Sequence, residues 1–206
     1  MIRLYRIPHS TNVERVALAL AHKGIAAESV WIDPADRSEV RRVSGQDLVP
    51  VIDDDGTIVA ESMDIVRYLE ERNPDSPLYP SDPSRRAEML VFIDWFNRVW
   101  KRPPNEIEAE LGRSEPDLIR VSELGRAMCE WLDLFEAMLA DRDYLMGDAF
   151  SAADCCAFPF LKYSGLPMPE GDDELFHRIL RDYQPLGDTN PRLEAWIRRV
   201  DERPRV

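Results

Sequence analysis

The 206-residue sequence is poor in cysteine and lacks any long apolar run. Its three cysteines are Cys129, Cys155 and Cys156. An odd number that includes one adjacent pair is neither the disulfide framework of a small secreted domain nor the spaced thiols of a zinc site. No stretch approaches the roughly 18 apolar residues of a membrane-spanning helix, and the N-terminus shows no apolar signal core. We therefore expect a reducing, cytoplasmic location, no membrane association and no metal.

Basic residues are also scarce relative to acidic ones. Lys and Arg total 26, Asp and Glu total 39, and the formal net charge is −13. This balance argues against nucleic acid and anionic membranes as partners, because both need a basic surface. With 44% hydrophobic and 32% charged residues, the composition is typical of a soluble globular protein rather than a disordered one.

The first third of the chain alternates strand patterns with helical ones. Residues 2–7 alternate apolar and polar side chains, as a half-buried strand does. Apolar residues then recur at helical spacing until Gly24, and residues 28–32 predict a second strand parallel to the first. The further expected elements are a helical turn in 37–43, a strand from Val49, a hairpin turn at 54–56, a strand over 57–60 and a helix from Ser62.

The pattern changes after a segment that is rich in proline. Residues 73–83 contain four prolines, which is typical of an extended linker. Beyond it only helices are expected, in stripes over 89–100 and 124–139, from Ser151, and over 173–181 and 191–200; Pro103 and Pro104 are expected to end the first stripe. We therefore predict an α/β domain of order β-α-β-α-β-β-α over residues 1–73, a linker over 74–83 and an all-α domain over 84–206.

Several motifs stand in the order found in glutathione transferases. The segments LVPVI at 48–52, DG at 55–56 and AESMDI at 60–65 resemble the glutathione-binding half of that family. The segment STNVERV at 10–16 is similar to the active-site turn of its serine-type classes, such as zeta and tau, and SAAD at 151–154 resembles the capping box of its helical domain. The resemblance implies a thioredoxin-like first domain and a homodimer built on the last helix of the first domain and the first two long helices of the second.

Ser10 is the catalytic residue that the resemblance implies. An unperturbed thiol, with a pKa of about 8.5, is mostly protonated at neutral pH, so a transferase must stabilise the thiolate. A hydroxyl that donates to sulfur at a helix N-terminus does this. From the residues alone, Ser10, Thr11 and Asn12 are equal candidates to cap the helix; the family assigns Ser10 to the thiolate, with Asn12 as a second polar group. No cysteine lies in this turn, which argues against cysteine-based thiol transfer.

Glutathione is the cosubstrate that the resemblance implies, and two further segments are expected to bind it. In a thioredoxin-like fold the Val49–Pro50 bond is cis, and the backbone of Val49 then pairs with the ligand like a strand; an ordinary proline at a strand entry is the alternative. Ser62, at the N-cap of its helix, is expected to bind the γ-glutamyl carboxylate, and Glu61 its ammonium group.

One element of the family pattern is absent. Many relatives carry Lys or Gln immediately before the Val-Pro pair, whereas this chain has Leu48. The glycyl carboxylate of glutathione then needs another partner, and a different low-molecular-weight thiol is an alternative ligand. Arg41, Arg42 and Gln46 are the candidates for this carboxylate, of which we take Arg42.

The electrophile is expected beside Pro8 and His9 on one side and the first long helix on the other. Trp100 is the pocket candidate on that helix, whereas Phe96 is expected in the core. The leading hypothesis is a cytoplasmic glutathione transferase that has no tightly bound cofactor and acts on a small hydrophobic electrophile. A non-catalytic binding protein of the same fold and a glutathione-dependent isomerase or reductase are the alternatives.

Overall fold

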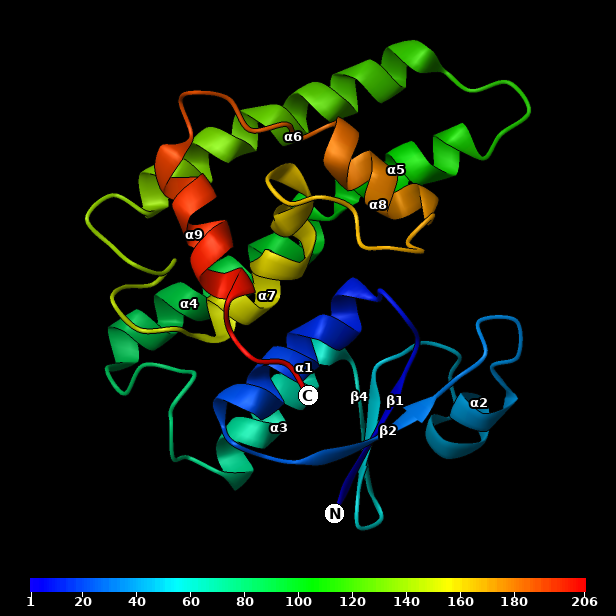
Figure 1. Ribbon diagram of the computed structural model, residues 1–206, viewed down its shortest axis with the longest axis vertical. Coiled ribbons are helices and arrows are strands. Elements are labelled where there is room, and N and C mark those ends of the chain that lie inside the picture. The colour runs from blue at the N-terminus through cyan, green and yellow to red at the C-terminus, as the bar shows by residue number, and fades with distance from the viewer. The chain divides into compact units, whose positions relative to one another are not determined.

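A computed structural model describes residues 1–206, which form two units (Figure 1). The first unit contains Met1–Tyr79 and Arg203–Val206, and the second contains Pro80–Glu202. The boundary between Tyr79 and Pro80 lies inside the linker predicted at 74–83. The last four residues belong to the first unit, whereas the sequence pattern assigned them to the helical domain.

The first unit contains a four-stranded mixed sheet. Its strands are β1 (Ile2–Arg6), β2 (Ala27–Trp31), β3 (Val51–Asp54) and β4 (Thr57–Ala60), in the order β2-β1-β3-β4. Strands β1 and β2 are parallel, and the other two pairs are antiparallel. With α1 (Thr11–His22), α2 (Ser38–Ser44) and α3 (Ser62–Arg72), the element order is the predicted β-α-β-α-β-β-α. The predicted fold class is confirmed.

Helices cover both faces of this sheet, because successive strand residues point to opposite sides. On one face Tyr5 and Val51 pack with Val40 of α2 in a buried cluster. On the other face lie α1 and α3, which contact each other (Figure 1). Both helices are amphipathic, and the buried positions of α1 include Val13, Val16, Ala17 and Leu20. Packing on both faces fixes where α1 and α3 begin relative to the strand ends.

Polar contacts hold the C-terminal residues on the first unit. The guanidinium of Arg6 donates to the main-chain oxygen of Val206 at 2.7 Å, and the Val206 N–H donates to the Ala17 carbonyl at 3.4 Å. Arg205 donates two hydrogen bonds to the Glu14 carboxylate at 3.1 and 3.2 Å. These partners lie about 190 positions apart in sequence, so no local pattern predicts them.

The second unit contains helices and one isolated β-bridge, Tyr144–Gly147. Its elements are α4 (Pro83–Trp95), the π-helical segment η1 (Phe96–Trp100), α5 (Arg102–Leu111), α6 (Leu118–Met138), α7 (Ala152–Leu161), the 3₁₀ turn η2 (Lys162–Ser164), α8 (Leu175–Asp182) and α9 (Pro191–Asp201). This confirms the all-helical prediction. No helix combines the length and the apolar character that crossing a bilayer requires.

Helix α5 was not predicted. The sequence pattern assigns Pro103 and Pro104 only to the end of the preceding helix, but they occupy the first turn of α5. Proline is tolerated there because the first N–H groups of a helix have no intrahelical acceptor, and its fixed φ suits the helix. The proline pair therefore marks the junction between two helices.

Candidate active site

The register of the sheet brings three of the predicted segments to one edge. Tyr5, near the end of β1, pairs with Val51 at the start of β3, and Val51 pairs with Ala60 at the end of β4. The turn after β1, the residues before β3 and the residues after β4 therefore lie at the same edge. These are the segments of Ser10, of Val49–Pro50 and of Glu61–Ser62.

Ser10 is the N-cap of α1. Its backbone is extended, and its Oγ accepts the Val13 N–H at 3.4 Å. The structure thus selects Ser10 among the three capping candidates, while Thr11 and Asn12 occupy the first turn. A hydroxyl has one donor hydrogen and two acceptor lone pairs. Capping uses a lone pair, so the hydrogen can still be donated to a ligand atom.

The turn before Ser10 has an unusual backbone. His9 is half-buried and has φ +56°, a conformation that few residues other than glycine adopt. Pro8 before it is exposed. This turn reverses the chain between β1 and α1, and it places Ser10 at the positive end of a 12-residue helix.

The Val49–Pro50 bond is cis, as the family resemblance implied. Pro50 is buried and Val49 is half-buried, directly before β3. Strand β3 lies between β1 and β4. The two residues therefore border the Ser10 turn on one side and the start of α3 on the other.

Ser62 begins α3, as the sequence predicts, but it is not the N-cap of that helix. The N-cap of α3 is Glu61, which makes no side-chain capping bond, and Ser62 is the first helical residue. The reason is the backbone of Glu61, whose φ of +68° turns the chain from β4 into the helix one residue earlier. Such conformations cost about 1–3 kcal/mol and cluster at functional sites. The Glu61 side chain is exposed, whereas Ser62 is buried.

The three candidates for the glycyl carboxylate differ in their existing contacts. Arg41 holds Asp47 through two hydrogen bonds of 2.7 and 2.8 Å, and the hydrogen bond from Arg41 lowers the pKa of Asp47. The amide of Gln46 folds back onto the main chain of Leu48, to which it donates at 2.8 Å and from which it accepts. Arg42 is exposed on α2 and is not held in such a pair. Leu48 is 67% exposed.

Trp100 is buried in the second unit. Its ring stacks on Phe96 with centroids 4.4 Å apart, and both rings contact Phe135 and Phe160 edge-on. Trp100 therefore takes part in the same core packing that was expected for Phe96 alone. The apolar pattern over residues 89–100 includes both rings, and it does not show which of them is in the core and which is in a pocket.

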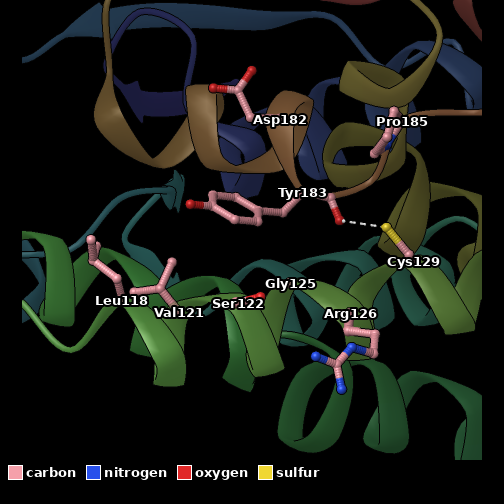
Figure 2. Close-up of a pocket in the computed structure, with 9 residues that line it drawn as sticks. All are labelled: Leu118, Val121, Ser122, Gly125, Arg126, Cys129, Asp182, Tyr183 and Pro185. Carbon is pink, nitrogen blue, oxygen red and sulfur yellow. Dashed lines mark hydrogen bonds between the residues drawn. The ribbon is translucent and has the colours of Figure 1, made fainter.

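A cavity of about 390 Å³ opens within the second unit (Figure 2). Its walls are α6 and the end of α8 with the residues that follow, and none of the predicted site residues lines it. The Tyr183 ring lies against α6, and the Cys129 thiol donates to the Tyr183 carbonyl at 3.3 Å (Figure 2). Burial raises the pKa of this thiol, and so does the neighbouring Glu130. A raised pKa disfavours the reactive thiolate.

Comparison with known families agrees with this geometry. Residues 4–77 match the glutathione S-transferase N-terminal domain, and residues 130–199 match the C-terminal domain of the same family. The chain belongs to the glutathione S-transferase family. The match to the N-terminal domain includes all three segments at the sheet edge.

Relatives of known name cover the whole chain. Protein LigF from a Sphingobium species is 27% identical over 100% of this chain and 91% of its own length. Glutathione S-transferase GstB of Escherichia coli is 28% identical over 100% of this chain and 96% of its own length. The crystal structure of β-etherase LigF has a TM-score of 0.81 at 24% identity, with 98% and 96% of the two chains covered. A theta-class glutathione S-transferase from Xanthomonas axonopodis pv. citri, with glutathione bound, has a TM-score of 0.73 at 25% identity, with 98% and 93% covered.

One residue of this family member's candidate site was missed from the sequence. Arg15 is buried on α1, and its Nη1 donates to the Oγ of Ser62 at 3.2 Å. The signal was an arginine on the apolar face of an amphipathic helix, next to Val16. A charged residue at such a position needs a partner, because an unpaired buried charge is costly.

Proposed function

We propose that this protein is a glutathione transferase in which the Ser10 hydroxyl stabilises the glutathione thiolate. The observation that supports this most is the position of Ser10 at the sheet edge. Its oxygen accepts the Val13 N–H, its hydrogen is free to be donated, and it lies at the N-terminus of α1. A thiolate placed there gains a hydrogen bond and the helix dipole, both of which lower the thiol pKa.

The reaction follows from that arrangement. The thiol proton leaves to solvent, the thiolate sulfur attacks an electrophilic carbon, and the carbon's bond to its leaving group breaks. Ser10 donates to sulfur in the ground state, and Asn12 in the same helical turn provides a second polar group. Holding sulfur and electrophile together supplies the remaining gain through proximity.

The same edge provides the glutathione contacts in this proposal. The main chain of Val49, before Pro50, pairs with the cysteinyl part of the ligand in the manner of an added strand. Ser62 and the first N–H groups of α3 bind the γ-glutamyl carboxylate, and the exposed Glu61 carboxylate binds the ammonium group. Arg42 is our proposal for the glycyl carboxylate, with Pro8 and His9 beside the electrophile.

The decisive test combines binding with turnover. We expect heat on mixing the protein with glutathione in a calorimeter, and conjugation of an activated aryl halide. Ser10→Ala should lower kcat/KM at pH 7 by about 10- to 100-fold, because a hydrogen bond to a charged group contributes about 1.5–3 kcal/mol. The deficit should shrink above about pH 8.5, where solvent itself ionises the thiol.

Matched variants separate the hydroxyl at position 10 from a general effect on the helix. Ser10→Thr keeps a hydroxyl and should retain most of the activity, and Thr11→Val removes the adjacent hydroxyl and should leave turnover near that of the wild type. Undiminished turnover by Ser10→Ala would refute the mechanism. Glutathione binding without turnover would favour the non-catalytic alternative.

Ether cleavage is a second candidate reaction, favoured by the full-length similarity to LigF, whose structure is described as a β-etherase. The thiolate would attack the carbon that bears an aryloxy group, a C–S bond would form, and the C–O bond would break. The phenoxide that leaves would take a proton from water. Parallel assays with an aryl halide and an aryl alkyl ether decide between the two substrates, since only ether cleavage releases a phenol. Conversion of an added substrate to an isomer would instead favour the isomerase alternative.

We also propose that the protein is a cytoplasmic homodimer. Reduced glutathione is the cosubstrate, and the three cysteines are free thiols, which fits a reducing compartment. The expected dimer surface is α3 together with α4 and α6.

A further inference from the structure

A buried arginine links the two helices that begin at the candidate site. Arg15 of α1 is 1% exposed. Its Nη1 donates to the Oγ of Ser62, the first residue of α3, at 3.2 Å. Helices α1 and α3 lie side by side (Figure 1). The contact therefore connects the helix that carries Ser10 to the helix start where the carboxylate of the ligand is proposed to bind.

The direction of this hydrogen bond determines what Ser62 can offer to a ligand. A guanidinium has only donors, so the hydroxyl oxygen must act as the acceptor toward Arg15. The hydrogen bond from Arg15 is the only one that the Ser62 side chain makes. Its own hydrogen thus has no acceptor in the protein, although Ser62 is only 6% exposed. A buried donor without an acceptor is unfavourable, and a ligand oxygen would satisfy it.

The surroundings favour an anionic acceptor. Ser62 is the first residue of an 11-residue helix, whose initial N–H groups and positive end attract carboxylates. The Arg15 cation, in hydrogen-bond contact with Ser62, increases this potential, and the burial of both side chains strengthens the effect. Next to it, Glu61 presents an exposed carboxylate. A donor for an anion beside an acceptor for a cation matches the carboxylate and ammonium of an amino-acid terminus.

We propose that Arg15 is a positioning residue, which orients Ser62 as a hydrogen-bond donor and so makes the site select thiols that end in an amino-acid carboxylate. The inference rests on the proposed glutathione site. Beyond that site, it assigns a role to Arg15 and explains how the protein would discriminate among low-molecular-weight thiols. Arg15 itself does not touch the ligand, and its effect is transmitted through the Ser62 hydroxyl.

The test compares two ligands on the full-length protein. One is glutathione, and the other is γ-aminobutyryl-cysteinyl-glycine, which lacks only the carboxylate of the γ-glutamyl group. We expect the wild type to bind glutathione at least about tenfold more tightly, since a hydrogen bond to a charged group is worth about a factor of ten or more. Ser62→Ala and Arg15→Met, which removes the donor to the Ser62 oxygen, should each reduce this preference to about threefold or less, and the double variant should reduce it no further. Ser62→Thr, which keeps the hydroxyl, should retain the preference of the wild type for glutathione.

A purely structural Arg15 gives a different result. If Arg15→Met weakens the binding of both ligands by the same factor, or keeps the tenfold preference, the proposal is wrong. If the wild type binds neither ligand, the proposed glutathione site is wrong, which differs from a failure of the Arg15 proposal alone. If the Arg15 variants do not fold, NMR of the wild-type protein replaces them, with the Arg15 side-chain nitrogen resonances as the readout. These should shift with glutathione and not with the analogue; equal shifts, or none, would overturn the inference.

Discussion

Two serine hydroxyls at the candidate site divide their hydrogen-bonding capacity in the same way. Ser10 Oγ accepts the Val13 N–H, and Ser62 Oγ accepts from Arg15. In each case the protein uses a lone pair of the hydroxyl oxygen and leaves the hydroxyl hydrogen available to a ligand. The ligand groups proposed for these two positions, a thiolate and a carboxylate, are both acceptors. A hydrogen bond that each serine accepts within the protein is therefore compatible with donation to a ligand.

Gly125 shows a residue whose small size is required by one neighbour. A Cβ added at this position would lie 2.3 Å from Cδ1 of Tyr183, the ring seen against α6 in Figure 2. Alanine normally favours a helix over glycine by about 1 kcal/mol. Displacing a ring costs about 1–3 kcal/mol, so we expect Gly125→Ala to lower the free energy of unfolding. Urea denaturation measures the change.

The matched control for that prediction is Gly112→Ala. An added Cβ there meets only backbone oxygens at 3.5 and 3.6 Å, which is ordinary van der Waals contact. Its stability should equal or slightly exceed that of the wild type. A Gly125→Ala protein as stable as Gly112→Ala would show that Tyr183 moves aside into the neighbouring cavity without cost.

Asp172 should make the protein sensitive to acid. Burial alone would raise the pKa of Asp172, but the hydrogen bond and charge of His177, together with the hydrogen bond from Tyr163, hold it below its ordinary value. A carboxylate with a depressed pKa in the folded state stabilises the protein above its unfolded pKa of about 4. That stabilisation is lost as the pH falls through the lower folded-state value.

The substitution Asp172→Asn tests this dependence. At pH 7 the variant should be less stable than the wild type, since the anionic partner of His177 is missing. Below about pH 4 the wild type should lose stability more steeply, so that the two curves approach each other. Urea unfolding at a series of pH values measures both curves. Parallel curves would show that Asp172 contributes nothing to acid unfolding.

At the scale of elements, one carboxylate joins three segments of the helical unit. Asp154 is fully buried in the first turn of α7 and forms the capping box with Ser151. Its oxygens also accept the Leu145 N–H at 3.0 Å and the Trp196 Nε1–H of α9 at 2.9 Å. The predicted capping box is therefore present, and it also ties a loop and another helix to α7.

Asp154→Asn should therefore destabilise the second unit strongly. The new amide NH₂ would face donors, and each donor left unpaired costs about 1–3 kcal/mol, so we expect a loss of about 2–4 kcal/mol. Thermal and urea unfolding measure it. The control is Asp117→Asn, an exposed N-cap of α6 that accepts from Ile119 and Arg120. Asparagine caps as well as aspartate, so the control should change stability little; similar losses in both variants would contradict the role of burial.

For the whole molecule, the proposed homodimer predicts that an apolar surface of the helical unit is covered. Val91 of α4 is 70% exposed, and it lies one turn before Trp95. Leu134 of α6 is exposed one turn after Trp131, and the two tryptophan rings contact each other at 5.7 Å. The paired helices thus present exposed apolar side chains together, which is typical of an interaction surface.

Val91→Glu should convert a dimer to a monomer, because association would bury an unpaired charge. Sedimentation or light scattering at matched concentrations measures the mass. Ala149→Glu, at an exposed loop position, is the control and should leave the mass unchanged. A wild-type protein of monomer mass would refute the homodimer, and an unchanged mass for Val91→Glu would place the interface elsewhere.

From the sequence one can predict the fold class, the order of elements in the first unit and the three segments that we propose as the site. Those signals are local: period-two and period-3.6 apolar patterns, turn residues, caps and short motifs. It did not predict α5, because Pro103 and Pro104 suit both the end of one helix and the first turn of the next. It also placed the cap of α3 one residue late, since the positive φ of Glu61 has no sequence signature.

Contacts between residues that lie far apart in the sequence became visible only in the folded protein. The register of the sheet brought the turns at 10, 49–50 and 61–62 to one edge, and the packing of α1 on α3 joined Arg15 to Ser62. The fold also placed Trp100 in an aromatic core and the last four residues on the first unit. Local patterns record which face of an element is buried, whereas the identity of the neighbouring residue depends on how distant elements pack.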